Sequence, residues 1–392
     1  MFQRARLFCL LLVSVTVWLP CLHLLWAVGP AEREALAATL AARQSRPSSS
    51  SEMRAVNPEW DFMRRTWVVL ALANRALAHP DERARNLAAI DAIVDRTLAE
   101  TDALGDAHFM LPYAKRAPFV DPEGRSLFID GEILAMIAAR DLVEPREATR
   151  AAARLRAERI ERAMRRSPSL SGESYPDECW TFCNTTALAG LAMLDRTAGT
   201  DHSSLARDWV AYAKAHLVDP ATGLLVSSYT FDGRPLEGPE GSSIWMIASN
   251  LLLVDEDFAR DQYARARREL GASFLGFGWA REWPRGTPPR PDIDSGPIVP
   301  LVEASAGSSG LALLGASAFD DRRWLSALLS SLELVGFRDD TTGRYRVSNE
   351  VGDAVLLYAL SFGPLWREVK ARSSDRSALL VAPSGVETGG ER

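Results

Sequence analysis

The chain has 392 residues, a formal net charge of −6 and four cysteines. A mildly acidic chain lacks the basic surface that nucleic-acid binding needs, so we expect no nucleic-acid partner. The length allows one large domain, and abundant alanine, leucine and arginine with little Val/Ile/Thr alternation favour helices over sheet.

Residues 7–28 form a nearly uncharged apolar segment that follows Arg4 and Arg6. About twenty such residues suffice to span a bilayer, and the leading arginines favour an amino terminus inside the cell. A cleavable signal peptide is the alternative, but the apolar stretch is long for one, and a proline follows Gly29. We therefore expect residues 1–29 to anchor the chain in the inner membrane with its domain on the periplasmic side. Cleavage would instead release the domain into the periplasm.

A serine-rich stretch runs from Ser45 to Ser51, and we assign residues 30–56 to a linker in which residues 31–45 can form a short helix. Beyond it, apolar periodicity and helix-ending residues predict helices that recur in pairs. Their ranges are 58–79, 84–103, 130–141, 145–166, 179–198, 203–217, 241–254, 256–272, 296–318, 321–336, 349–361 and 364–372. The polar residues 372–392 are expected to be a disordered tail.

Twelve predicted helices in six hairpins fit an (α/α)6 barrel, or toroid, in which one helix of each pair lies inside and the other outside. A generic helical bundle or a solenoid is the alternative. Residues 57–371 then form one all-α domain, with a pocket enclosed by loops at one end. Long connections occur at 105–129, 218–240 and 276–297. The second has an Asp-Gly turn between extended runs, which predicts a small β-hairpin.

The segment Ser174–Asn184 (SYPDECWTFCN) is rich in acids, thiols and aromatic rings and precedes an apolar helical run. Pro176 and Asp177 are residue types that favour a helix start. Cys179 and Cys183 would share one face of a helix. A polar helix entrance of this kind indicates the floor or rim of a small-molecule pocket.

The remaining two cysteines lie in the apolar amino-terminal segment, so the folded domain has too few for a disulfide scaffold. The five histidines show no paired spacing. We therefore expect no metal site.

Short motifs follow one another along the second half of the chain. They are Ser174-Tyr-Pro-Asp177, Cys183-Asn184, Leu194-Asp-Arg196, Gly199-Thr-Asp201, Asp219-Pro220, Ser228-Tyr229 and Trp245. In this order and spacing they resemble the linalool dehydratase/isomerase family, most densely over residues 174–270 and more weakly over 58–141 and 292–318. The resemblance implies an (α/α)6 barrel and cofactor-free acid/base chemistry on a small terpenoid alcohol. It also implies an exported protein able to form a ring-like homo-oligomer.

The chain departs from this family at three places. The family's first catalytic cysteine corresponds to Ser174, so only Cys183 of the pair is kept. The family's pocket histidine corresponds to Gly131-Glu132, and its tyrosine-rich first helix to Glu59–Met63, which holds no tyrosine. These departures move the expected proton transfers onto carboxyl groups.

Dehydration or isomerisation of an alcohol needs an acid that protonates the leaving hydroxyl and a base that removes a proton nearby. A carboxyl group performs either role once burial raises its pKa. The candidate catalytic residues are therefore Asp177, Cys183, Glu132 and Asp61. Each also fits a structural role, the acids as helix caps or first-turn dipole partners and the cysteine as a small buried hydrophobe.

Aromatic and polar residues near these candidates would line the pocket, where ring faces attract a developing allylic cation. The candidate substrate-binding residues are Tyr175, Cys179, Asn184, Tyr229, Trp245 and Asp294. The aromatic residues fit an ordinary core equally well, and Asp294 can instead cap the next helix. We expect Asp61, Glu132, Asp177, Cys183 and Asp294 to converge on one end of the barrel.

Three functions fit these patterns. The leading hypothesis is a cofactor-independent lyase or isomerase acting on a small apolar alcohol such as a terpenoid. The second is a carbohydrate-active α/α-barrel enzyme, since paired carboxylates and tryptophans such as Trp180, Trp279 and Trp283 suit sugars. The third is a non-catalytic envelope-associated binding protein. A closed apolar pocket, an open cleft and a filled or absent pocket would distinguish them.

Overall fold

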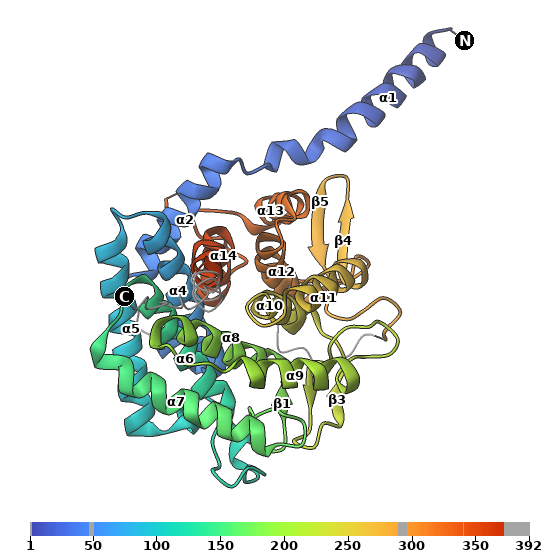
Figure 1. The fold of residues 1–392 in the computed structure, drawn as a ribbon. Coiled ribbons are helices and arrows are strands. Elements are labelled where there is room, and N and C mark those ends of the chain that lie inside the picture. The colour runs from blue at the N-terminus through green and yellow to red at the C-terminus, as the bar shows by residue number, and fades with distance from the viewer. Residues whose placement is uncertain (1, 47–50, 289–295, 340, 372–392) are drawn as a thin grey trace, which may run out of the picture.

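The computed structural model describes residues 2–46, 51–288, 296–339 and 341–371, and this part of the chain is mostly helical (Figure 1). Six helices form an inner ring: α4 (Pro58–Ala78), α6 (Leu127–Val143), α8 (Thr181–Ala198), α10 (Gly241–Leu251), α12 (Ala306–Ala318) and α14 (Glu350–Ser361). Each packs against the next, and α14 packs against α4, which closes the ring. This closure confirms the predicted (α/α)6 toroid.

Outer helices follow the inner ones along the chain and cover the ring. They are α5 (Arg83–Leu104), α7 (Glu147–Arg166), α9 (Ser203–His216), α11 (Glu256–Glu269) and α13 (Arg322–Gly336). Their sequences are amphipathic, with an apolar stripe toward the ring and arginines and acids toward solvent. The helices α6 and α12, by contrast, are apolar nearly all round because they lie inside.

Helix α6 is the most deeply placed element, since all of its residues are buried. Its contact with α8 is close because each of the two helices has a glycine at the contact, Gly131 on α6 and Gly190 on α8. A Cβ atom on Gly131 would lie 3.0 Å from the Cβ of Ala187, and one on Gly190 would lie 3.2 Å from the backbone nitrogen of Ala135. Small residues at these positions therefore bring the two helix backbones together.

Short elements occupy the connections. They are α3 (Ser51–Val56), η2 (Asp106–His108), η3 (Pro112–Lys115), β1 (Cys179–Trp180), β2 (Ser228–Tyr229), β3 (Pro235–Glu237), β4 (Gly271–Phe274), β5 (Phe277–Ala280), β6 (Ile298–Val299) and β7 (Ala304–Ser305). Strands β2 and β3 pair antiparallel around Asp232-Gly233, which confirms the predicted hairpin. The helix expected at 296–318 begins at Ala306 instead, because β6 and β7 form a hairpin ahead of it.

The sixth outer position is filled from the amino-terminal side. Helix α2 (Pro30–Gln44) packs against α14 and α4, and its residues Leu36, Ala37, Leu40 and Ala41 are buried. The expected linker at 30–56 is therefore too long, because its first part belongs to the folded body.

The carboxy-terminal helical segment, predicted as the sixth outer helix, lies across one end of the ring. Residues 364–371 are helical. The Leu365 N–H donates to Oδ1 of Asn74 in α4 at 2.9 Å, and Nε1 of Trp366 donates to the carbonyl of Ser249 in α10 at 3.1 Å. These bonds join opposite sides of the ring and cover the end at which the inner helices finish.

The first helix, α1 (Phe2–Cys21), projects away from the body and has no buried residue (Figure 1). Together with the 3₁₀ turn η1 (Leu22–Trp26), it leads into α2. Among the described residues, this amino-terminal helical stretch is the one long and apolar enough to cross a membrane. Such a helix at an amino terminus fits an anchor or a signal sequence.

Replacing Leu40 of α2 with alanine tests whether α2 is part of the folded body. Leu40 is fully buried, so Leu40→Ala should lower the free energy of unfolding by about 2–5 kcal/mol. The neighbouring Thr39 is exposed on the same helix, and Thr39→Ala should change it by less than about 0.5 kcal/mol. Thermal or urea unfolding measures both, and equal stability of the two variants would contradict the packing of α2.

Candidate functional site

The segment 171–180 forms a hairpin loop rather than the start of a helix. Tyr175 and Glu178 form an antiparallel bridge around Pro176 and Asp177, and Asp177 has a φ of 55°. Proline suits the first central position of a turn and aspartate tolerates the left-handed region, so the residue types that suggested a helix start also suit a turn. Helix α8 begins later, at Thr181.

Cys179 consequently lies on a strand and not on a helix with Cys183. It belongs to β1 and is paired with Tyr229 of β2. Its side chain is fully buried, and burial raises the pKa of its thiol well above the ordinary value. The prediction that the two thiols share one helix face is therefore wrong.

Glu132 is the most unusual titratable group of the inner ring. Its side chain lies inside the ring on α6 and is 1% exposed, and neither carboxylate oxygen has a hydrogen-bond partner among the described residues. Burial raises the pKa of Glu132 to about 8, and the neighbouring Thr66 hydroxyl of α4 opposes this rise. Near neutral pH the group is thus a protonated carboxylic acid, which is the form that donates a proton.

Cys183 lies on α8, which packs against α6, and it is 6% exposed. Burial is the main cause that raises the pKa of its thiol well above the ordinary value, and the charges of Glu132, Glu59 and Glu178 add to it. The side chain of Ser174 hydrogen-bonds the thiol and opposes the rise. Cys183 therefore stays a neutral thiol, which disfavours a role as nucleophile.

Around Glu132 and Cys183, a rim of acids and aromatic rings closes the end of the ring. The Tyr175 hydroxyl donates to the carboxylate of Glu59 and accepts the Leu111 N–H at 2.8 Å. The ring of Tyr113 stacks on that of Tyr175 with centroids 4.4 Å apart. These contacts fix the first turn of α4 against the hairpin and the long loop 105–129.

Glu178 is the second acid of the rim. Its carboxylate accepts Nε1–H of Trp180 at 2.6 Å and the Tyr113 hydroxyl at 3.3 Å. Burial raises the pKa of Glu178, and these two bonds partly offset the rise. Glu59, Tyr113, Glu178 and Trp180 are each half-buried, so solvent reaches the rim although it hardly reaches Glu132.

Three members of this group were missed by the sequence analysis: Glu59, Tyr113 and Glu178. Glu178 lies next to Asp177 in the Ser174–Asn184 segment, and the pattern that marks Asp177 as a candidate acid marks Glu178 equally. Glu59 precedes Asp61 at the start of the same helix, and side chains two apart on a helix point to different faces. Nothing in the local sequence marks Tyr113, which reaches the rim through a long loop.

Asp61 and Asp177 lie away from Glu132 and Cys183. Asp61 is buried and forms an ion pair with Arg65 at 2.8 Å, while Arg65 also binds Glu100 of α5 at 2.6 Å, so Asp61 faces the outer layer. Asp177 is exposed on its turn and accepts the Phe231 N–H at 3.1 Å. That bond ties the turn to the β2–β3 hairpin.

Asn184 and Tyr229 are occupied by structural hydrogen bonds. The Asn184 side chain accepts the Gly172 N–H at 2.9 Å and donates to the carbonyls of Gly172 and Trp180 at 3.1 and 3.0 Å. The Tyr229 hydroxyl shares a hydrogen bond of 2.7 Å with that of Ser171. Asn184 thus holds the hairpin loop onto α8, and Tyr229 holds it onto β2.

Trp245 belongs to the core on the other side of the ring, where it donates to Oγ of Ser308 at 3.1 Å and packs on Trp324. Asp294 lies outside the described residues. Of the predicted site residues, Cys183 lies within electrostatic reach of Glu132, and Tyr175 is linked to this pair through Glu59. Among the described residues, no group of three or more His, Cys, Asp or Glu side chains is placed to hold a metal ion.

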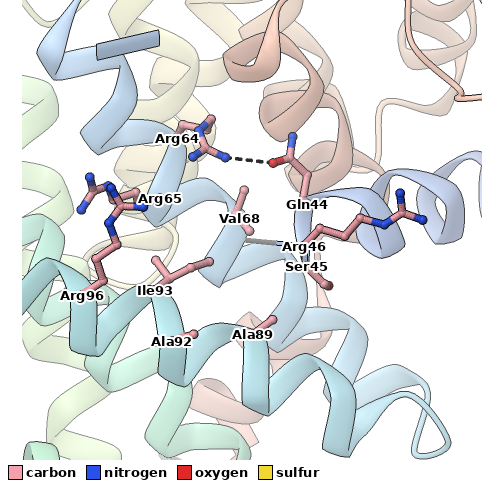
Figure 2. A pocket seen from close by; sticks show the side chains of 10 residues that line it. All are labelled: Gln44, Ser45, Arg46, Arg64, Arg65, Val68, Ala89, Ala92, Ile93 and Arg96. Carbon is pink, nitrogen blue, oxygen red and sulfur yellow. Dashed lines mark hydrogen bonds between the residues drawn. The ribbon is translucent and has the colours of Figure 1, made fainter. Parts of the chain in front are cut away.

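Two cavities in the described part of the structure lie away from Glu132 and Cys183. The larger, of about 140 Å³, lies between α2, α4 and α5, with an apolar floor that includes Val68 and Ile93 and arginines around it (Figure 2). The smaller, of about 10 Å³, is lined by charged residues such as Asp121, Arg125 and Asp130.

No protein-family model and no curated protein matches this chain. Among solved structures, it is similar to the unsaturated glucuronyl hydrolase of Bacillus sp. GL1, with 13% identity, a TM-score of 0.50, and coverage of 75% of this chain and 84% of the other. The GH76 α-mannanase of Bacteroides thetaiotaomicron has 10% identity, a TM-score of 0.46, and coverage of 79% and 87%. At 13% identity, the first likeness concerns the fold alone.

The pH dependence of stability tests the burial of Glu132. The folded state keeps the proton up to about pH 8, whereas the unfolded chain releases it near the ordinary pKa of 4.5. The contribution of Glu132 is therefore complete below about pH 4.5 and is lost as the pH rises to about 8, by up to about 1.4 kcal/mol per pH unit. Glu132→Gln should flatten this fall in thermal melts between pH 5 and 8.5.

The exposed Glu158 of α7 offers a matched control. Glu158→Gln should leave the pH profile of the melting temperature as it is in the parent. Parallel profiles for the parent and Glu132→Gln would show that Glu132 ionises normally in the folded state.

Proposed function

We propose that this protein is a cofactor-independent acid/base enzyme that breaks or moves a C–O bond in a small hydroxyl-bearing molecule, as a dehydratase or isomerase does. The single observation that carries the proposal is the buried Glu132, whose pKa burial raises to about 8, within electrostatic reach of the Cys183 thiol, as are Glu59 and Glu178. A buried acid with no hydrogen-bond partner among the described residues costs stability, and such groups cluster at functional sites.

The two proton transfers can be assigned from helix geometry. Glu59 and Thr66 lie seven residues apart on one face of α4, roughly 10 Å along its axis, and Thr66 is the neighbour of Glu132. Glu132 would protonate the leaving hydroxyl, which departs as water. Glu59 at the rim would then accept the proton from the adjacent carbon, with its charge oriented by the Tyr175 hydroxyl.

Aromatic side chains pack along α4 at the level of these two acids. Phe62 of α4 lies between Glu59 and Thr66 along the helix and packs on Phe109 and Phe128, with centroids 4.6 and 5.2 Å apart. Rings of this kind suit a hydrocarbon carrying one hydroxyl, and ring faces stabilise an allylic cation. The resemblance to linalool dehydratase/isomerase supports the same class of substrate.

A second candidate is a carbohydrate-active enzyme, favoured by the half-exposed rim. Trp180 and Tyr113 present aromatic rings there, and Glu178 lies between them as a second carboxyl group. Sugars stack on such rings, and hydrolysis of a glycosidic bond needs the same kind of proton donor. The fold shared with a glucuronyl hydrolase agrees with this candidate at the level of architecture.

A substrate screen separates these functions. Full-length protein in detergent would be incubated with monoterpenoid alcohols and with oligosaccharides, and the products would be identified by gas and liquid chromatography. Alkene or isomer products from the alcohols support the proposal, and shortened sugars support the second candidate. Binding without turnover in both sets would contradict an enzymatic function.

Amide variants test the assignment of the acid. Glu132→Gln should lower kcat about a hundredfold to ten-thousandfold, because it removes a positioned proton donor while keeping the shape. Cys183→Ala should have a smaller effect, since its thiol stays neutral. Asp177→Asn serves as the matched amide control, because Asp177 lies exposed on a turn, and it should keep most of the activity. Full activity of Glu132→Gln would overturn the assignment.

A further inference from the structure

We propose that one side of the toroid rests on the lipid bilayer, through an apolar surface formed by the tip of the β4–β5 hairpin and the carboxy-terminal end of α13. We call this surface the membrane-facing patch and define it by Phe274, Leu334, Val335 and Phe337. The proposal takes α1 as the membrane span and goes beyond the proposed catalytic function.

Directly after α1, the chain packs on the folded body. In η1, the ring of Trp26 lies 6.0 Å from that of Phe277 in β5, and the ring of His23 lies 6.3 Å from it. The turn also contacts α13. Any membrane that holds α1 is therefore held close to β5 and α13, with no free linker between them.

Further contacts continue this attachment into α2. Arg33 donates to the carbonyl of Val28 at 2.9 Å and to Oγ of Ser326 in α13 at 2.7 Å. Arg338, just past α13, binds Glu32 at 3.1 Å. The start of α2 is thereby fixed along α13, which sets the orientation of the body relative to η1.

The surface of the body next to η1 is apolar and exposed. Phe274, at the tip of the hairpin, is 67% exposed, and Val335 is 55% exposed. Strand β5 runs along α13, where the Gly278 N–H donates to Oγ of Ser331 at 2.9 Å. Leu334 and Val335 follow Ser331 by three and four residues and so continue that face of α13. Phe337, 65% exposed, extends it.

We infer that a lipid bilayer covers the membrane-facing patch, because the patch is continuous with the apolar surface of α1 and η1. Leu22, Leu24 and Leu25 of η1 are exposed beside it, directly after an apolar helix with no buried residue. Trp26 adds the type of side chain that is enriched at membrane–water interfaces. In Figure 1, α1 and the tip of the β4–β5 hairpin project from the same edge of the ring, next to α13. A bilayer that holds α1 would thus meet the patch.

This orientation would leave the site end of the ring unobstructed. In Figure 1, α12 and α14 are seen nearly end-on while α1 and the hairpin project sideways. The outer wall, and not an open end, would then face the lipid. The rim with Glu178 and Trp180 would remain accessible along the membrane surface, where apolar molecules concentrate.

Site-specific fluorescence in nanodiscs tests the patch. Full-length protein with the exposed Cys9 and Cys21 replaced by serine would carry one added cysteine, labelled with an NBD group, at Phe274, Val335 or the control Glu158. Cys179 and Cys183 are buried and should not react. Helix α7, which carries Glu158, lies on the far side of the ring from α1 in Figure 1.

Labels at Phe274→Cys and Val335→Cys should emit at shorter wavelength and lose intensity with lipids that carry a nitroxide near the headgroup. The Glu158→Cys label should do neither. Solvent-like, unquenched emission at all three positions would overturn the proposal, as would failure of the full chain to insert. Blue-shifted emission without lipid quenching would indicate a second copy on the patch and would also contradict it. Unchanged melting temperatures would show that the labelled variants are folded.

Discussion

Closure of the inner ring is the constraint on which the rest of the structure depends. Each inner helix gains a buried face only if it has a neighbour on both sides, and the last contact, α14 on α4, joins segments at opposite ends of the domain. The close approach of α6 and α8 through Gly131 and Gly190 keeps this ring narrow. The interior is consequently filled with side chains, and polar groups inside it are strongly desolvated.

The chemistry of the candidate site follows from that filled interior. A carboxyl group in the first turn of a surface helix would be a dipole partner with an ordinary pKa. On the wholly buried α6, the same side chain at Glu132 keeps its proton near neutral pH. The ring has two ends, and the helical segment 364–371 lies across the one where the inner helices finish, through Leu365 and Trp366. The loops at the other end are therefore free to build a rim of acids and aromatic rings.

The amino-terminal region is part of the fold and also carries the apolar helix. Helix α2 completes the outer layer, and the contacts of Trp26 and Arg33 pass from the apolar helix into the body. One continuous segment therefore contains both the exposed apolar helix and a part of the folded body.

Local sequence patterns determined the helices, the Asp-Gly hairpin, the apolar first helix and the paired arrangement of the ring. These features depend on periodicity and turn chemistry within a few residues, which a single sequence contains. The sequence also marked Glu132, Cys183 and Tyr175, because a polar helix entrance is visible locally. Tertiary structure alone decided that Asp61 faces Arg65, that Asp177 lies on an exposed turn, and that Glu59 and Tyr113 join the rim. It also decided which helix fills the sixth outer place, because α2 and segment 364–371 are both amphipathic enough for it. Those outcomes depend on which distant segments become neighbours, and no local pattern contains that information.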